Sequence, residues 1–264
     1  MVLGLTALAC GAVRAAEAPR VMSLDQCADQ YVLALAPRAS IVGISYRAAD
    51  PDSYLHAEAT GLPRRRATSE AILGAAPNVV VTYWGGDPLL FRTLSRGGVK
   101  VVQINEATDF EGVRDNVRQV AAALGQPGRG AALVARMDGQ LARANGAWRG
   151  RPAVYLTSAG YTAGSGTLVH AILQSAGLHD AAQSSGFARA SIERLLLDPP
   201  MALVLGFFDR YGLSQQNWGP GRQGMMGSLA RTRAIDSLPG GLLGCPAWFA
   251  GDAVQSLGAA AQRR

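Results

Sequence analysis

The chain has 264 residues, of which 48% are hydrophobic and 6% aromatic, so it can bury a large core and is not typical of a disordered protein. Its formal charge is +6 and comes almost entirely from arginine, because Lys100 is the only lysine. The sequence has no dense basic stripe beyond Arg64-Arg65-Arg66, and after residue 18 it has no apolar run long enough to span a membrane. Composition therefore favours neither a nucleic-acid-binding protein nor an integral membrane protein.

Residues 1–18 predict a signal peptide. The run from Val2 to Val13 is apolar and rich in small residues, and Ala16-Glu17-Ala18 provides a cleavage site. No basic segment precedes the run, and a lipoprotein signal at Leu8-Ala9-Cys10 is a weaker alternative because its apolar residue is out of place. We therefore expect an exported, periplasmic protein that is soluble once the leader is removed.

Residues 19–126 predict an N-terminal α/β lobe. Asp25 can cap a helix that runs to Leu35, a second helix follows Ala67, and a third covers residues 88–98. Amphipathic spacing predicts one more helix over residues 109–124. Strands alternating with helices indicate parallel pairing. The expected strands cover residues 20–24, 41–45, 78–83 and 100–104.

Residues 127–149 predict a connecting helix, and residues 150–264 predict a C-terminal α/β lobe. A helix of about 20 residues would span about 30 Å and could join the two lobes as a rigid strut. The long segment 208–231 is rich in Gly, Gln and aromatic residues and is expected to be a loop. The other expected elements are strands over 153–158 and 201–207, a short strand near Ile235, and helices over 167–176, 190–196 and from Asp252.

One phrase occurs twice in the chain, 123 positions apart. Glu70 stands seven residues before Pro77, Glu193 stands seven residues before Pro200, and an apolar strand follows each proline. Such a repeat indicates two similar α/β units. The predicted fold is therefore α/β, with two Rossmann-like lobes that carry short parallel sheets, one long helix between them, and a ligand cleft where they face each other.

The two cysteines of the mature chain, Cys27 and Cys245, lie near its opposite ends. In an oxidising compartment such a pair can form a disulfide, which would close a loop of about 220 residues and be worth about 4–5 kcal/mol in chain-entropy models. Two buried free thiols are the alternative.

Several segments, in this order, resemble the periplasmic solute-binding proteins of ABC importers for iron–siderophore complexes and cobalamin. They are Val21 to Gln30, the two Glu–Pro phrases, Tyr83-Trp84-Gly85-Gly86, the predicted connecting helix and Gly160 to Leu168. The resemblance implies a monomer that captures a metal chelate, with ferric siderophore and cobalamin ahead of heme, and delivers it to an inner-membrane permease. It implies no catalysis, no cofactor of its own and no nucleic-acid partner.

The resemblance also gives each repeated glutamate a role. Glu70 and Glu193 match the exposed acidic residues, one per lobe, that dock onto arginines of the permease. Two charges fixed on rigid lobes would set orientation and aid encounter. The alternative is that each glutamate only complements the dipole of its helix, worth about 0.3–1 kcal/mol.

Ligands of open parallel sheets bind beyond the carboxyl ends of the strands, and this rule selects the candidate ligand residues. Their aromatic rings could stack on a flat macrocycle, and Arg47 and Arg210 could bind carboxylates. Packing within a loop is an equal alternative for each ring except the Tyr83-Trp84 pair. The candidates are Asp25, Tyr46, Arg47, Tyr83, Trp84, Asn105, Tyr161, Phe207, Arg210, Trp218 and, through the tail, Trp248.

Direct metal binding and catalysis are less favoured. His56, His170 and His179 show no metal-ligand spacing. A two-lobed enzyme such as a glycosyltransferase or chelatase is the alternative function, because Gly160 to Gly166 could cradle a phosphate. No lysine follows that run as in a P-loop, no G-x-S-x-G motif occurs, and such enzymes normally carry no export signal.

Overall fold

A four-stranded parallel sheet forms the centre of the N-terminal lobe. The computed structural model describes residues 19–83, 85–211 and 220–263. The strands run in the order β2-β1-β3-β4, and they are β1 (Val21–Ser23), β2 (Ile41–Gly43), β3 (Val79–Tyr83) and β4 (Lys100–Ile104). Successive side chains of β3 face opposite sides of the sheet, and both sides are buried: Val79 and Val81 join one apolar cluster, and Val80 joins another.

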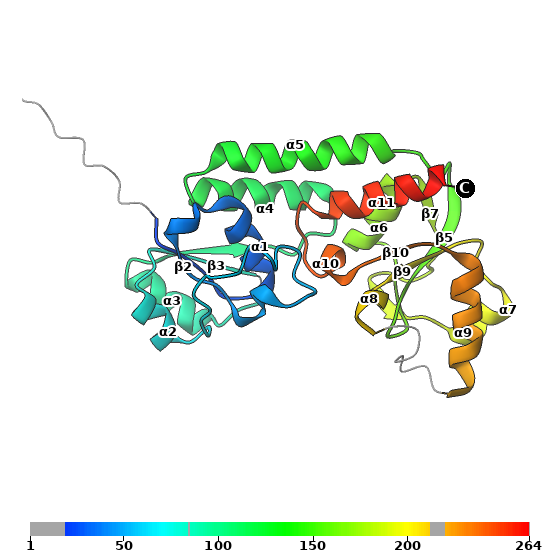
Figure 1. Cartoon of the computed structure of the whole chain (residues 1–264), viewed down its shortest axis with the longest axis horizontal. Helices are drawn as coiled ribbons and strands as arrows, with labels where there is room; N and C mark the ends of the chain where they lie inside the picture. The colour runs from blue at the N-terminus through cyan, green and yellow to red at the C-terminus, as the bar shows by residue number, and fades with distance from the viewer. Residues whose placement is uncertain (1–18, 84, 212–219, 264) are drawn as a thin grey trace, which may run out of the picture.

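Helices cover both faces of this sheet (Figure 1). On one side are α1 (Gln26–Leu35) and α4 (Phe110–Ala123), and on the other are α2 (Ser69–Ala75) and α3 (Pro88–Arg96). A side-chain oxygen accepts a backbone N–H at the start of each helix, which fixes where it begins. The capping residues are Asp25, Thr68, Asp87 and Asp109.

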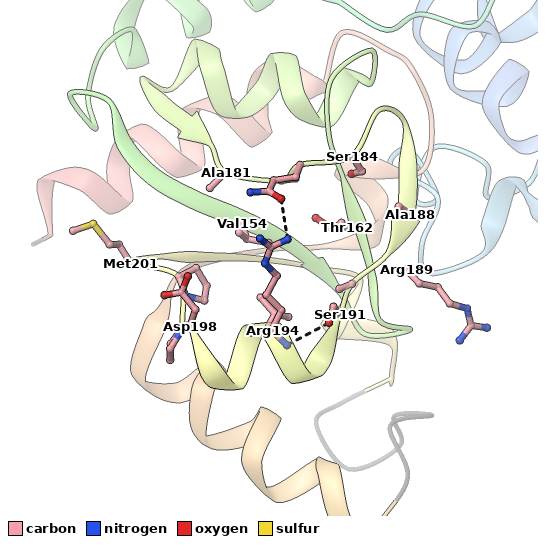
Figure 2. Close-up of a pocket in the computed structure, with 16 residues that line it drawn as sticks. Val154, Thr162, Ala181, Ser184, Ala188, Arg189, Ser191, Arg194, Asp198 and Met201 are labelled. Carbon is pink, nitrogen blue, oxygen red and sulfur yellow. Dashed lines mark hydrogen bonds between the residues drawn. The ribbon is translucent and has the colours of Figure 1, made fainter.

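The C-terminal lobe repeats this topology. Its parallel sheet runs in the order β10-β9-β5-β7, and read from the other end, β7-β5-β9-β10, this matches β2-β1-β3-β4. A short antiparallel pair, β6 (Tyr161–Ala163) and β8 (Phe187–Arg189), forms a separate two-stranded sheet in this lobe. The main strands are β5 (Arg151–Thr157), β7 (Leu178–Asp180), β9 (Leu203–Gly206) and β10 (Ala234–Leu238). The helices are α6 (Leu168–Ser175), α7 (Ile192–Leu197), α8 (Phe208–Tyr211) and α9 (Pro220–Arg233). A cavity lies between α7 and the segment around β8 (Figure 2).

A layer of long helices joins the lobes along one side of the molecule (Figure 1). The connecting helix α5 (Pro127–Ala144) packs against α4 of the first lobe and against α11 (Ala250–Gln262), which follows α10 (Gly240–Leu243). Helices α5 and α4 approach each other closely at Gly130 of α5, where an added Cβ would lie 2.4 Å from the Cβ of Ala121 in α4. One apolar cluster contains residues of both lobes, so the two halves share a core.

The structure confirms the predicted fold class and corrects individual elements. The sequence predicts a loop over segment 208–231, yet α8 and α9 cover all of its described part. The connecting helix ends at Ala144 instead of near residue 149, and the strands β6, β7 and β8 were not expected. Within the described residues, no helix is both long and apolar enough to cross a bilayer.

Candidate ligand-binding cleft

A cavity of about 670 Å³ lies at the carboxyl ends of β1, β2 and β3. Its wall includes Tyr46 and Tyr83, three arginines and, from the C-terminal lobe, Gly244. The position follows the rule for open parallel sheets, in which ligands bind beyond the ends of the strands. The size is in the range of small-molecule sites. The three arginines are Arg47, Arg65 and Arg66.

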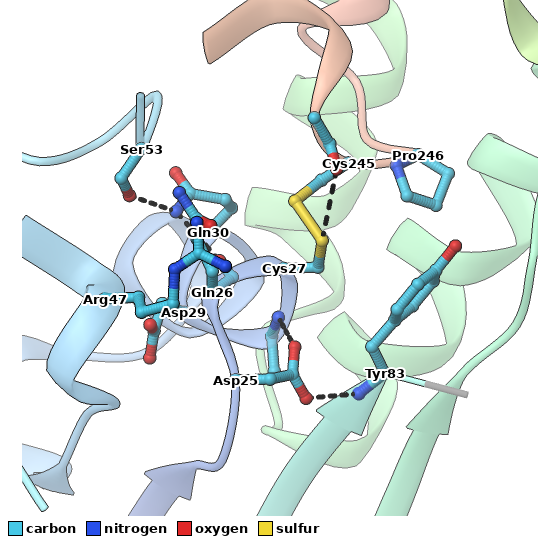
Figure 3. Close-up of a disulfide and its surroundings, with 12 residues drawn as sticks. Asp25, Gln26, Cys27, Asp29, Gln30, Arg47, Ser53, Tyr83, Cys245 and Pro246 are labelled. Atoms are coloured by element: carbon cyan, nitrogen blue, oxygen red, sulfur yellow. Dashed lines mark hydrogen bonds between the residues drawn. A yellow bond between two sulfur atoms is a disulfide. The ribbon is translucent and has the colours of Figure 1, made fainter. Parts of the chain in front are cut away.

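Asp25 fixes the end of β3 relative to α1. One carboxylate oxygen accepts the N–H of Ala28 at 2.8 Å, and the other accepts the N–H of Tyr83 at 2.6 Å and the hydroxyl of Thr82 at 3.1 Å (Figure 3). Asp25 lines the cavity as the sequence suggested. With both oxygens engaged by the protein, its carboxylate positions Tyr83.

Tyr83 is held at its other end as well. Its hydroxyl donates to a carboxylate oxygen of Glu106, which follows β4, at 2.7 Å. The ring is therefore fixed at the backbone by Asp25 and at the phenol by Glu106. A ring held in this way can stack on a flat ligand with little loss of side-chain entropy on binding.

Tyr46 and Arg47 occupy a short 3-10 turn, Tyr46–Ala49, directly after β2. The Tyr46 side chain is 56% exposed, and Arg47 is also exposed. The Arg47 guanidinium lies 3.2 Å from Asp50 and 3.6 Å from Asp52, which orients it along the cavity wall. A guanidinium at this position can bind the carboxylate of a ligand through paired N–H groups.

A buried carboxylate beneath the cleft holds this turn in place. Asp29 of α1 is fully buried and accepts hydrogen bonds from the hydroxyl of Ser23 and from both the N–H (2.9 Å) and the hydroxyl (2.5 Å) of Ser45. Burial raises the pKa of Asp29 to about 6, although the three hydrogen bonds act in the opposite direction. Asp29 thus connects α1 to the ends of β1 and β2.

The C-terminal tail closes one side of the cavity. A disulfide joins Cys27, at the start of α1, to Cys245, and Gly244 beside it lines the cavity (Figure 3). The hydroxyl of Tyr31 donates to the carbonyl of Pro246 at 2.5 Å. Segment 244–249 therefore lies against the N-terminal lobe, although it belongs to the second lobe in sequence.

The sequence of residues 21–206 matches a family described as "Periplasmic binding protein". This match covers more than half of the chain and includes β1, β2 and β3, at whose ends the cavity lies. The chain belongs to the periplasmic binding protein family.

A curated protein also resembles this chain in sequence. A cobalamin-binding protein from Halobacterium salinarum is 27% identical over 200 residues, which cover 72% of this chain and 54% of that protein. The chain thus spans about half the length of that relative.

Two solved structures share the fold. The periplasmic heme-binding protein RhuT from Roseiflexus sp. RS-1 has a TM-score of 0.70 at 22% identity, over 94% of this chain and 99% of the other. The vitamin B12 binding protein BtuF of Vibrio cholerae has a TM-score of 0.62 at 17% identity, over 93% and 97%. All three relatives are named as binding proteins, so the comparisons do not favour the enzyme alternative.

Trp248 does not line the cleft, contrary to expectation. It is 2% exposed and packs edge-on against Tyr31 and Phe249, with ring centroids 5.5 Å and 5.4 Å away. The tail does reach the N-terminal lobe, but its tryptophan fills the shared core. The sequence rule selected Trp248 by its position in the tail and gave no information on which way the ring points.

Three further ligand candidates, Tyr161, Asn105 and Phe207, are not on the wall of the cleft cavity. Tyr161 is 38% exposed, and the Arg189 guanidinium lies 5.5 Å from its ring centroid. The backbone N–H of Asn105 donates to the side-chain oxygen of Asn116, whose side-chain nitrogen donates back to the carbonyl of Asn105. Half-buried Phe207 lies against Gly240. Trp84, Trp218 and the side chain of Arg210 are outside the part of the chain that the structure describes.

Sequence reasoning missed several residues that form the cleft. Arg65 and Arg66 lie on its wall, and Asp29 supports it from below. The run Arg64-Arg65-Arg66 was visible in the sequence, but it precedes α2 in a loop, where no strand end marked it as part of a site. A parallel bridge between Ile44 and Arg64 brings this loop beside the end of β2.

Glu70 and Glu193 occupy equivalent places in the two lobes. Each lies in the first turn of its helix, α2 or α7, and each is exposed. The two helices lie in different lobes (Figure 1). Among the described residues, no group of three or more His, Cys, Asp or Glu side chains is arranged to bind a metal ion.

Proposed function

We propose that this protein captures a metal chelate in its cleft and delivers it to an ABC importer in the inner membrane. The observation that carries the proposal is the cavity wall, which combines two exposed or half-buried tyrosines with Arg47, Arg65 and Arg66 at the carboxyl edge of a parallel sheet. Rings and guanidinium groups together suit a flat or catechol-rich chelate that carries carboxylates or other negative charge. Relatives named for cobalamin and heme support the chelate class.

The proposal includes where the protein works and how it is divided. Residues 1–18 would direct export to the periplasm, where a monomer would present residues 19–126 and 150–264 as two lobes around the connecting segment 127–149. Residues 1–18 lie outside the described part of the structure. The function needs no resident cofactor, because the metal arrives and leaves inside its chelate.

The ligand prediction is tested by titrating the oxidised protein with hemin, cyanocobalamin and a panel of ferric siderophores, monitored by tryptophan fluorescence. We expect one chelate class to bind. If the bound chelate is anionic, Arg47→Gln should weaken its binding about tenfold, because a charge-assisted contact is lost. Arg118→Gln is the control, since Arg118 lies on α4 and pairs only with Glu111 and Asp115 in the described structure. If no chelate quenches the fluorescence or raises the melting temperature, the proposal is wrong.

We further propose that Glu70 and Glu193 dock the protein onto cationic residues of the permease. Their equivalent places on α2 and α7 give two negative points on lobes that share one core, so their separation is fixed. Fixed charges at a rim mainly speed encounter and set orientation. The cleft wall and the docking residues are separate groups, so the two activities can be separated by mutation.

The docking prediction is that Glu70→Arg combined with Glu193→Arg lowers uptake of the chelate by cells at least about tenfold, since two attractive contacts become repulsive. Affinity of the purified protein for the chelate should stay within about twofold. Glu58→Arg reverses another exposed glutamate of the N-terminal lobe and should leave uptake unchanged. Normal uptake by the double variant, or lost ligand affinity, would contradict docking.

A further inference from the structure

The C-terminal lobe contains a second cavity of about 670 Å³ that is separate from the cleft. None of the residues on its wall lies on the wall of the cleft cavity. We propose that this cavity binds a small amphiphilic carboxylate, meaning an apolar body with one carboxylate group. The inference does not depend on the proposed chelate function.

One part of the wall is apolar. Val154 of β5 and Leu195 of α7 face the cavity together with Pro200 and Met201, which follow the end of α7. Met201 is 56% exposed, an unusual degree for a large apolar side chain. These side chains could cover the apolar body of a ligand and remove it from water.

An exposed arginine, Arg194, lies on the cavity wall. Figure 2 shows the side chain of Arg194 extending from α7 toward Val154 and Thr162. Its Nη1 donates to the side-chain oxygen of Gln183 at 2.8 Å, which holds the group in this direction. A guanidinium has five N–H groups in a planar fork, so Arg194 can keep this bond and still bind a carboxylate through its other nitrogens.

The balance of charge on the wall favours an anion. The wall carries two arginines, Arg189 and Arg194, and one acidic side chain, Asp198. Figure 2 shows the end of Arg189 pointing away from the labelled group around Arg194. Arg194 is therefore the cation that a ligand inside the cavity would meet.

Two buried hydroxyl groups face this cavity without a hydrogen-bond partner among the described residues. Thr162 is 8% exposed, and neither its Oγ1 nor the Oγ of Ser184 has a partner, although both residues line the cavity. Buried polar atoms are nearly always paired, because leaving one unpaired costs free energy. A carboxylate bound at Arg194 would provide acceptors for such hydroxyl donors.

The backbone that carries Ser184 is held firmly. Gly164 packs so closely on this segment that an added Cβ would lie 1.8 Å from the carbonyl oxygen of Ser184. The N–H of Gly164 donates to the carbonyl of Gly186 at 2.9 Å, and the N–H of Gly186 donates to the carbonyl of Ser165 at 2.8 Å. The hydroxyls are thus presented from fixed positions, which lowers the entropy cost of binding.

The test uses para-fluorobenzoate as the probe and para-fluorobenzamide as its neutral match. Binding of each compound to the full oxidised protein is measured by the broadening of the compound's fluorine NMR signal. We expect the carboxylate to bind with a Kd in the millimolar range or below and the amide to bind at least about tenfold more weakly. Arg194→Gln should weaken carboxylate binding by about tenfold, while Arg118→Gln, on α4 and outside the walls of both cavities, leaves it unchanged. No broadening by the carboxylate at about 10 mM, or equal affinity of wild type and Arg194→Gln, would overturn the proposal.

Thr162→Val separates a binding role from a structural one. Valine has nearly the shape of threonine and removes an unpaired buried hydroxyl, so the empty protein should melt at the same temperature or higher. The same substitution should weaken binding of the probe, since the probe's carboxylate loses a hydroxyl donor. A lower melting temperature with unchanged probe affinity would show that the hydroxyl serves the fold and would overturn its place in the site.

Discussion

A single buried carboxylate links the fold of the N-terminal lobe to the cleft. Asp29 receives hydrogen bonds from Ser23 at the end of β1 and from Ser45 just before Tyr46 and Arg47. Loss of these contacts would release the turn that carries two proposed ligand residues. Because burial, with a smaller effect from nearby Asp25, raises the pKa of Asp29 to about 6, the folded protein keeps this carboxyl protonated to a higher pH than the unfolded chain does.

We predict that Asp29 makes stability fall as pH rises from about 4 to about 6. Its folded pKa of about 6 exceeds the unfolded value of 3.8, so folding takes up a proton in this window, and the stabilisation is complete below the unfolded pKa and lost above the folded one. The free energy of unfolding of wild type minus that of Asp29→Asn should drop by about 2–3 kcal/mol between pH 4 and pH 7, measured by urea denaturation. A difference that stays constant over this range would show that Asp29 titrates alike in both states.

Most elements of the first lobe follow from local signals. The apolar run Val79-Val80-Val81 predicts a central parallel strand, and the structure buries it on both faces. Asp25 stands at the position expected for a helix cap, and it caps α1. Local signals fail for α9, because Gly221, Gly224 and Gly227 interrupt it and it has no clear apolar stripe. The repeat held the missing information: β3, α3 and β4 follow one another in the first lobe, so parallel strands β9 and β10 also require a crossover helix.

Part of the candidate cleft could be predicted from the sequence as well. The carboxyl-end rule placed Asp25, Tyr46, Arg47 and Tyr83 at one edge of a sheet, and all four line the cavity. It could not place Arg65 or Arg66, whose loop reaches the cavity through the bridge between Ile44 and Arg64. It also could not show that Trp248 turns into the core, because ring direction depends on packing between segments more than 200 residues apart.

At the scale of the whole molecule, the lobes are joined by more than the connecting helix. Segment 244–249 returns to the N-terminal lobe, and Phe249 stacks on Tyr54 with ring centroids 4.3 Å apart. Asp252 at the start of α11 accepts from the hydroxyl of Tyr54 at 2.7 Å and from Arg136 of α5 at 2.8 Å. The first lobe, the connecting helix and the tail thus meet at one carboxylate, a geometry that resists hinge opening of the cleft.

The disulfide should contribute mainly to stability, with a smaller effect on the shape of the cleft. It links residues 218 positions apart, and in the chain-entropy model closing so long a loop destabilises the unfolded chain by about 5 kcal/mol. We predict that Cys27→Ser with Cys245→Ser lowers the unfolding free energy by several kcal/mol, up to about this value, in urea denaturation. Wild type with reductant is the matched control and should lose a similar amount.

Chelate affinity should change far less, because Tyr31, Tyr54 and Arg136 still hold the tail against the first lobe. Equal stability of the oxidised and serine proteins would show that the tail contacts alone hold the two ends together.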